Sequence, residues 1–284
     1  MPDEHLTIGI CGSGTMGAGL AEVAARAGMS VIVRGRTDDS NAKLVATLTA
    51  SMARQVAKQK LVQDDMDAAV SRVRTTTSIG HLEQCDLVIE SIVEDLDAKL
   101  GIVAELGAVL KPIAIVATNT STLSVEALAQ RSGRPDRTVG IHFFNPATTM
   151  PLVEVVRAAS TSDETVAAAE SFARRCGKEP VHVLDRPGFI VNALLFPYLN
   201  SAVKMLEAGT ASMPDIDAAM KGGCNHPMGP FELLDLVGLD VAVSILGALH
   251  RGFGDPAMEP APTLRALVAE GKLGRKTKQG FYSY

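Results

Sequence analysis

The chain has 284 residues, 46% hydrophobic and 21% charged, which is enough for about two domains with sizeable apolar cores. Its formal net charge of -5 and pI near 5.7 argue against non-specific binding to nucleic acid or to an anionic membrane surface. No apolar run reaches the roughly 18 residues of a membrane span, and the four cysteines lie far apart without metal-binding spacing, so we expect a cytoplasmic protein with no metal site and no disulfide framework.

The first element is a short β-forming run, Thr7–Cys11, followed by a glycine-rich turn and then by apolar residues at helical spacing. Gly12 permits a tight turn, Gly14 lets the backbone approach a pyrophosphate, and Gly17 lets the helix pack closely on the strand. The order strand, turn, helix predicts a dinucleotide-binding βαβ unit, although such a turn can also serve packing alone. The predicted cofactor contacts in this turn are Gly12, Gly14, Thr15, Met16 and Gly17.

The next strand runs from Ser30 to Val33 or Arg34 and ends where an acidic residue would bind the adenosine ribose of NAD, but this chain has Arg34, Gly35 and Arg36 there. A carboxylate would repel a 2′-phosphate, whereas glycine makes room for one and guanidinium groups pair with it. We therefore expect Arg34, Gly35 and Arg36 to contact the cofactor and NADP(H) to be favoured over NAD(H). Asp38 and Asp39 follow closely and keep NAD(H) open.

A helical pattern runs from Asn41 to Gln59 and places Ser51, Arg54 and Lys58 on one face. Such a face is either simply solvated or binds an anion.

Two continuous apolar runs, Cys85–Ile92 and Ile113–Thr118, are typical of strands buried in a parallel sheet. Polar residues follow each of them, and the carboxyl ends of such strands line the ligand crevice of a doubly wound sheet. The polar residues are Glu94 and Lys99 after the first run, and Asn119, Thr120, Ser121 and Thr122 after the second. An alternative for Thr122 or Ser124 is that it caps the helix that begins near Val125.

The strongest candidate for a general base lies in the β-forming run Thr138–Phe143, which carries His142 near its end. The Asn145-Pro146 turn signal follows, and Leu152–Val156 is predicted to fold back as a second strand, so Glu154 can face His142. A carboxylate that accepts from one imidazole nitrogen fixes the tautomer and suits the ring for proton transfer. The alternative is a core histidine beside an unrelated glutamate.

The pattern changes after a predicted helix, Asp163–Cys176, and a strand, Val181–Leu184, because the rest of the chain is helical in period. We expect an α/β fold in which a Rossmann-like doubly wound sheet is followed by an all-α helical domain. The expected boundary gives residues 1–186 to the dinucleotide-binding domain with the histidine, and 187–284 to a helical substrate and dimerisation domain. Asn192, in the first turn of the first long helix, is either a packing residue or a site residue.

Several motifs together resemble the short-chain (S)-3-hydroxyacyl-CoA dehydrogenases, including the bacterial 3-hydroxybutyryl-CoA dehydrogenases, from end to end. The matching motifs are Gly12-x-Gly14-x-x-Gly17, Asn119-Thr120-Ser121, His142-Phe143-Phe144-Asn145-Pro146, Glu154, Pro187-Gly188-Phe189-Ile190-Val191-Asn192, His226-Pro227-Met228-Gly229-Pro230 and Gly280-Phe281-Tyr282.

The resemblance implies a Rossmann domain, a helical domain that forms a homodimer, and catalysis in the cleft between them. It implies that His142 is the general base, Glu154 its partner, and that Ser121 and Asn192 hydrogen-bond the substrate. It also implies cofactor contacts from Glu94, Lys99, Asn119, Asn145 and Lys276, and coenzyme A contacts from Ser51 and Lys58, beside which Arg54 lies.

The expected reaction is reversible oxidation of a (3S)-3-hydroxyacyl-CoA, such as 3-hydroxybutyryl-CoA, by a nicotinamide cofactor. Three departures from the family pattern bear on specificity. Gly35 replaces a ribose-binding aspartate, Ala147-Thr148-Thr149 replaces a more proline-rich loop, and Ala193 replaces an arginine of some relatives. Alternatives are a dehydrogenase of free hydroxy acids or sugar acids, related to gulonate 3-dehydrogenase, and a catalytically silent nucleotide-binding protein.

Overall fold

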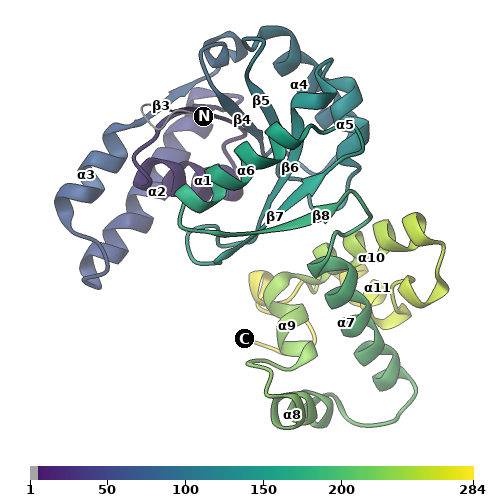
Figure 1. The fold of residues 1–284 in the computed structure, drawn as a ribbon. Helices are drawn as coiled ribbons and strands as arrows, with labels where there is room; N and C mark the ends of the chain where they lie inside the picture. The colour runs from purple at the N-terminus through teal and green to yellow at the C-terminus, as the bar shows by residue number, and fades with distance from the viewer. Residues whose placement is uncertain (1–5) are drawn as a thin grey trace. The chain divides into compact units, whose positions relative to one another are not determined.

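The computed structural model describes residues 6–284, which form two compact units that divide between Asp185 and Arg186 (Figure 1). The first unit is built on a sheet, and the second consists of helices. This architecture confirms the expected fold class, a Rossmann-like doubly wound sheet followed by a helical domain.

The first unit contains an eight-stranded sheet in the order β3-β2-β1-β4-β5-β6-β7-β8. The strands are β1 (Thr7–Cys11), β2 (Ser30–Arg34), β3 (Val73–Thr76), β4 (Leu87–Glu90), β5 (Ile115–Thr118), β6 (Thr138–Phe143), β7 (Leu152–Arg157) and β8 (Glu179–Leu184). Strands β1 to β6 pair in parallel, β7 runs antiparallel to β6, and β8 runs parallel to β7. The chain order reverses beside β1, where β2 lies on one side and β4 on the other, and a crevice at this switch point is the usual ligand site of such sheets.

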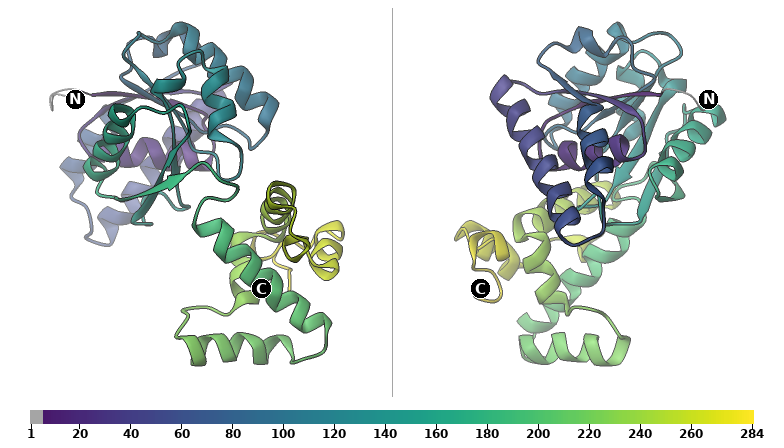
Figure 2. Two further views of the ribbon diagram at one scale, coloured as in Figure 1. Left: turned by 45° about the vertical axis from the view of Figure 1, so that its right-hand side comes forward. Right: turned by 90° about the vertical axis from the view of Figure 1, so that its left-hand side faces the viewer.

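Helices cover both faces of the sheet (Figures 1 and 2). They are α1 (Thr15–Arg26), α2 (Asp38–Ala57), α3 (Gln63–Ser71), α4 (Leu96–Val109), α5 (Val125–Arg131) and α6 (Asp163–Arg175), with short 3₁₀ turns at Ile79–Leu82 and Pro135–Arg137. Three elements of this unit, α3, β3 and α4, were not predicted from the sequence.

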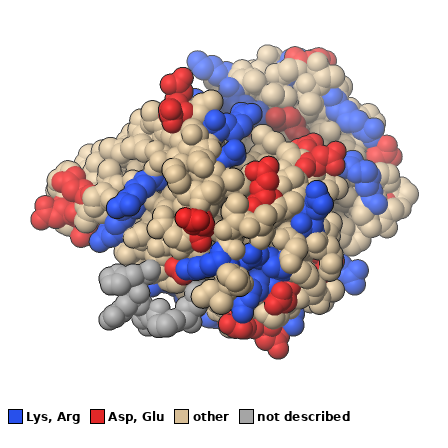
Figure 3. Space-filling model, turned by 90° about the horizontal axis from the view of Figure 1, so that it is seen from above, with Lys and Arg blue, Asp and Glu red and all other residues tan. Residues whose placement is uncertain are grey.

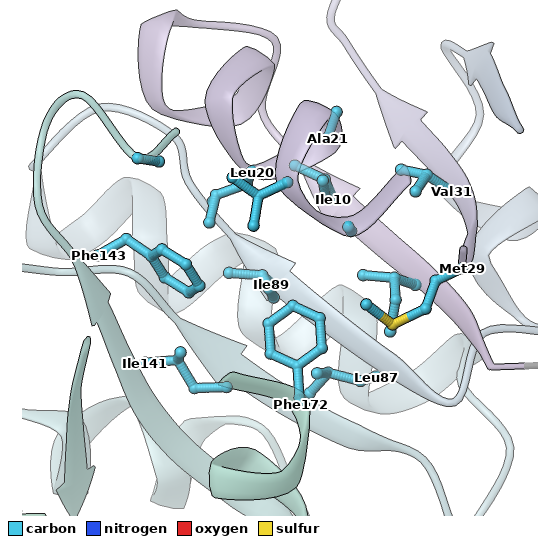
Figure 4. Packing of buried hydrophobic residues seen from close by; sticks show 14 of the residues in the cluster. Ile10, Leu20, Ala21, Met29, Val31, Leu87, Ile89, Ile141, Phe143 and Phe172 are labelled. Carbon is cyan, nitrogen blue, oxygen red and sulfur yellow. The ribbon is translucent and has the colours of Figure 1, made fainter. Parts of the chain in front are cut away.

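One face of the sheet packs against α1, α2, α3 and α6 in the larger apolar core, part of which is drawn in Figure 4. Ile10, Ile89, Ile141 and Phe143 come from the three strands β1, β4 and β6, and Phe172 of α6 packs on them with its ring 6.3 Å from that of Phe143. The other face carries the alternate residues of the same strands and packs against α4 and α5. Its core members include Cys11, Val88, Val103, Val116 and Leu128.

The second unit contains five α-helices in its described residues, all of which lie in the range 186–284. They are α7 (Val191–Glu207), α8 (Met213–Cys224), α9 (Pro230–Val237), α10 (Leu239–Phe253) and α11 (Pro262–Ala269), with 3₁₀ turns at Pro256–Met258 and Arg275–Thr277. Phe196, Phe231 and Leu246 lie in their shared core. Figure 2 shows this unit as helices and loops without a sheet.

Two buried aspartates of the second unit hold the end of the chain against the helices. Asp235 accepts hydrogen bonds from the backbone N–H groups of Phe281 and Tyr282, at 2.9 and 2.8 Å. Asp217 accepts from the backbone N–H of Phe231 and from the Tyr282 hydroxyl. A buried carboxylate is stable only when such donors replace water, so these contacts explain why both acids are tolerated in the core.

Between residues 6 and 284, no single helix is both long and apolar enough to cross a membrane. Helices α9 and α10 pass the same test of length and composition only when they are taken together, and they are bent by 98° relative to each other.

On the face drawn in Figure 3, Lys and Arg side chains are interspersed with Asp and Glu. The four cysteines, Cys11, Cys85, Cys176 and Cys224, are all free thiols.

Candidate functional site

The site is built at the carboxyl ends of β4, β5 and β6, on the face of the sheet opposite the larger core. Side chains alternate along β6, so Ile141 and Phe143 pack into that core and His142 between them points to the other face. Strand β7 pairs antiparallel with β6 and sets Glu154 directly opposite His142. The two side chains therefore share one face, as the sequence analysis predicted.

His142 and Glu154 form a buried hydrogen-bonded pair, with His142 Nδ1 2.7 Å from Glu154 Oε2. His142 is 6% exposed and Glu154 is fully buried. A carboxylate accepts the Nδ1 hydrogen, which fixes the ring orientation and leaves Nε2 as the basic nitrogen of the neutral ring. The Phe144 ring lies beside the imidazole, with ring centroids 4.5 Å apart. The arrangement suits a group that exchanges a proton through Nε2.

Asn119 links the end of β5 to the strand that carries His142. Its side-chain Oδ1 accepts a hydrogen bond of 2.8 Å from the backbone N–H of Phe143, the residue after His142. The backbone N–H of Asn119 itself donates to the carbonyl of Glu90 at the end of β4. Asn119 therefore joins three neighbouring strand ends.

Glu94 lies in the loop after β4 and holds the loop after β5. Its Oε1 accepts from the Thr120 hydroxyl at 2.6 Å, from the Ser121 backbone N–H at 2.8 Å and from the Ser121 hydroxyl at 3.1 Å. Burial raises the pKa of Glu94, but the Lys99 charge and the hydrogen bonds from Thr120 and Ser121 outweigh it and hold that pKa below its usual value. Glu94 and Ser121, predicted separately, are thus direct neighbours.

A second acid, Glu90, lies behind this loop and was not singled out from the sequence. It is the last residue of β4, fully buried, and its Oε1 is 2.6 Å from the Nζ of Lys99, which is itself 1% exposed. The signal that could have found it is a carboxylate inside the apolar run Cys85–Ile92, since a charge in a buried strand requires a partner.

Hydroxyl groups after β5 divide between two roles. Ser124 caps α5, because its Oγ accepts from the backbone N–H of Ala127, as the alternative in the sequence analysis expected. The Thr122 hydroxyl instead donates to Glu94.

The glycine turn after β1 fits a pyrophosphate. Gly12 has φ of +130°, and a Cβ there would lie 2.3 Å from the Ser91 carbonyl oxygen, so only glycine fits without strain. A Cβ on Gly17 would lie 2.0 Å from the Gly12 carbonyl oxygen. Gly14 is the N-cap of α1, has open space where its Cβ would be, and offers no side-chain cap to the helix N–H groups. The helix N-terminus can therefore donate to an anion.

The Arg34-Gly35-Arg36 segment at the end of β2 has an unusual environment. Two side-chain oxygens lie close to Gly35. A Cβ at this position would lie 2.1 Å from Asn41 Oδ1 and 2.8 Å from Ser40 Oγ. Arg34 lies close enough to the buried Cys11 thiol to lower its pKa against the effect of burial, whereas Arg36 is exposed. A side chain at position 35 would thus displace the Asn41 and Ser40 side chains, and glycine also leaves out a carboxylate.

The remaining predicted residues lie on several elements. Ser51, Arg54 and Lys58 lie along the end of α2, with Arg54 and Lys58 exposed, and Asn145 is exposed just after β6. In the second unit, Asn192 lies in the first turn of α7 and is 6% exposed. Lys276 Nζ lies 2.5 and 2.6 Å from the two carboxylate oxygens of Asp240.

Among residues 6–284, no cluster of His, Cys, Asp and Glu is placed to hold a metal ion.

A doubly wound sheet with an open glycine turn and a buried His–Glu pair at a neighbouring strand end defines a class of protein, the dinucleotide-dependent oxidoreductases of Rossmann type. Comparisons with known proteins narrow this class. Residues 7–186 match the family model of the 3-hydroxyacyl-CoA dehydrogenase NAD binding domain, and residues 188–284 match that of the 3-hydroxyacyl-CoA dehydrogenase C-terminal domain.

Relatives match over nearly the whole chain. A 3-hydroxybutyryl-CoA dehydrogenase of Bradyrhizobium diazoefficiens is 44% identical over 98% of this chain and 94% of its own length. The human mitochondrial hydroxyacyl-coenzyme A dehydrogenase is 42% identical over 99% of this chain and 91% of its own. The crystal structure of (S)-3-hydroxybutyryl-CoA dehydrogenase from Ralstonia eutropha superposes with a TM-score of 0.95 at 42% identity, covering 98% of each chain. The chain belongs to the 3-hydroxyacyl-CoA dehydrogenase family.

Proposed function

We propose that the protein reversibly oxidises a (3S)-3-hydroxyacyl-CoA, of short chain such as 3-hydroxybutyryl-CoA, to the 3-ketoacyl-CoA. The observation that carries the proposal is the buried His142–Glu154 pair at the carboxyl end of β6. Membership of the family and the names of relatives at 40 to 44% identity support the substrate class.

In this proposal His142 Nε2 takes the proton of the substrate 3-hydroxyl during oxidation and returns it during reduction. Glu154 accepts from Nδ1 throughout, so the ring keeps its orientation while its charge changes. Ser121 and Asn192 hydrogen-bond the substrate oxygen and hold it in position. When bound, the nicotinamide supplies or accepts the hydride, and the protein's own contribution is placement and proton transfer.

The cofactor pyrophosphate would lie on the glycine turn, against Gly12, Gly14, Thr15, Met16 and Gly17. The open space at Gly14 and the uncapped start of α1 support this. Glu94, Lys99, Asn119, Asn145 and Lys276 are proposed as further cofactor contacts, by resemblance to the family. Glu94 and Asn119 already accept hydrogen bonds from Ser121 and Phe143, and the proposal gives them a second role as cofactor contacts.

His142→Ala is expected to lower kcat by about 10² to 10⁴-fold, the usual contribution of a general acid or base, with cofactor affinity little changed. The measurement is steady-state reduction of acetoacetyl-CoA together with cofactor binding by fluorescence. The matched control is His182→Ala, because His182 also contacts a glutamate, Glu170, but is exposed on β8. Near wild-type turnover in His142→Ala would refute the role of His142.

The Arg54 and Lys58 side chains of α2, with Ser51, are proposed to bind the phosphates of coenzyme A. An exposed ion pair contributes up to about 1 kcal/mol, so the double change R54A/K58A should raise KM for acetoacetyl-CoA roughly 5- to 30-fold at low salt and leave kcat unchanged.

Free acetoacetate is the control substrate, because it lacks the phosphates that this helix would contact. Turnover of free acetoacetate as fast as that of the CoA ester, unaffected by R54A/K58A, would instead favour a dehydrogenase of free acids.

We propose that NADP(H) is preferred over NAD(H), with Arg34, Gly35 and Arg36 at the 2′-position of the adenosine ribose. Two features support it: Gly35 carries no carboxylate, and the Arg36 side chain is exposed. Asp38 and Asp39, in the first turn of α2, are the groups that would oppose a 2′-phosphate.

Arg36→Ala should lower kcat/KM for NADPH roughly 10- to 100-fold and leave that for NADH nearly unchanged, since a charge-assisted hydrogen bond contributes about 1.5 to 3 kcal/mol. The control is Arg131→Ala, which removes an exposed arginine from the end of α5. A wild-type preference for NADH would overturn the proposed cofactor preference without affecting the proposed substrate.

We also propose a homodimer formed through the helical C-terminal unit. Its exposed apolar side chains support this, because Leu194 is 71% exposed, Met205 46% and Leu236 47%. Light scattering should give about twice the 29.8 kDa chain mass. Leu194→Asp should shift the mass toward the monomer, and Val62→Asp, at an exposed apolar position of the first unit, should not. A wild-type monomer would exclude the dimer.

A further inference from the structure

Glu90 is a charged residue in the interior of the first unit that the proposed mechanism leaves without a role. It ends β4 with no solvent exposure and lies on the sheet face that packs against α4. An ionised carboxylate in such a place is stable only if hydrogen bonds and an opposite charge replace its water. Its partners therefore indicate what the charge does.

Three different segments donate to this one carboxylate. Glu90 Oε1 accepts from the backbone N–H of Ile92 at 2.7 Å and from Lys99 Nζ of α4 at 2.6 Å, and its Oε2 accepts from the Thr118 hydroxyl of β5 at 2.7 Å. Glu90 thus ties the loop after β4 and the start of α4 to the end of β5.

The Lys99 ammonium connects this buried acid to the candidate site. It is 1% exposed and lies between two carboxylates, 2.6 Å from Glu90 Oε1 and 3.4 Å from Glu94 Oε2. The other oxygen of Glu94 accepts from the backbone N–H and the hydroxyl of Ser121. A continuous line of contacts therefore runs from Glu90 through Lys99 and Glu94 to Ser121.

The remaining neighbour of Glu90 on this face does not compete for the Lys99 charge. Cys11 is paired in register with Glu90 on one side and with Arg34 on the other. Burial raises the pKa of the Cys11 thiol to about 12, although the nearby Arg34 lowers it, so the thiol stays neutral. Among the described residues 6–284, the acids within ion-pair distance of Lys99 are Glu90 and Glu94.

We infer that Glu90 is a positioning residue, which fixes Lys99 so that its ammonium orients Glu94, and Glu94 in turn holds the Ser121 hydroxyl in place for the substrate. The inference rests on the proposed role of Ser121 in binding the substrate oxygen. Without the Glu90 charge, the one acid within ion-pair distance of Lys99 in the described part of the chain is Glu94, and Lys99 draws that carboxylate away from the 120–122 loop. Glu90 acts through this loop and does not touch the reacting atoms.

Glu90→Gln tests the inference, because glutamine keeps the size of the side chain and one carbonyl acceptor but removes the charge. At a temperature where the variant is fully folded, kcat for acetoacetyl-CoA should fall about 10- to 100-fold, and KM should change by less than about 3-fold, since a small misplacement costs the chemical step more than binding. Amide hydrogen exchange across residues 119–124 should become about 10-fold faster, as the N–H groups of Ser121 and Thr122 lose their acceptor.

Asp86→Asn is the matched control for a purely structural carboxylate. Asp86 precedes the same strand at its opposite end and accepts from the Thr7 backbone N–H at 2.8 Å and from Lys111 at 2.5 Å. This variant should lose thermal stability but keep wild-type kcat and wild-type exchange across residues 119–124.

Thr118→Val serves if Glu90→Gln does not fold, because it removes the hydroxyl that donates to Glu90 and leaves every charge in place. The same hydroxyl accepts from the Thr120 backbone N–H, so exchange in this variant is read at Ser121 and Thr122, whose N–H groups are bound to Glu94. Thr118→Val should lower kcat about 2- to 10-fold, and exchange at the Ser121 and Thr122 amides should rise by less than in Glu90→Gln. Unchanged kcat and exchange in the folded Glu90 or Thr118 variant, or equal losses in Asp86→Asn, would overturn the inference. A wild-type enzyme without turnover of acetoacetyl-CoA would refute the proposed function instead, and loop exchange alone would then decide whether Glu90 positions Ser121.

Discussion

The antiparallel pairing of β7 with β6 is the constraint on which the candidate site depends. Strands β1 to β6 are all parallel, and parallel neighbours bring only their carboxyl ends to the same edge. The reversal at β7 sets the middle of one strand opposite the end of another, which is how Glu154 comes to face His142. A shift of one residue in this pairing would turn Glu154 to the other face of the sheet. The apolar neighbours Val153 and Val155, packed in the larger core, hold the register in place.

The alternation of side chains along each strand also places the polar groups of the site on one face of the sheet. Glu90, Thr118 and His142 occupy the face toward α4 and α5, while their neighbours Ile89, Ala117 and Ile141 fill the larger core. The apolar core on one side therefore fixes the backbone that positions the charges on the other. Rigid strands place such groups more precisely than loops can.

Much of this organisation could be predicted from the sequence because it depends on short-range patterns. The alternation around His142, the glycines before α1 and the apolar runs before Glu94 and Ser121 each indicated their elements. The contact between Glu94 and Ser121 could not be predicted from local pattern. The two residues are 27 positions apart in the sequence, and their loops meet only because β4 and β5 are neighbours in the sheet. Residues 63–109 were predicted only in part, because β3 is short and partly exposed and α4 is apolar over most of its surface, which weakens its helical period.

The packing around Gly35 has a consequence for how the cofactor site can change during evolution. An acidic side chain at this position would start 2.1 Å from the Asn41 amide oxygen, which is buried and accepts no hydrogen bond from any residue in the range 6–284. The Asn41 amide nitrogen is bound to the Thr76 carbonyl, so the amide cannot turn without losing that bond. Positions 35 and 41 are therefore coupled: an aspartate at position 35 would require the Asn41 side chain to move and give up its bond to Thr76, or residue 41 to be replaced.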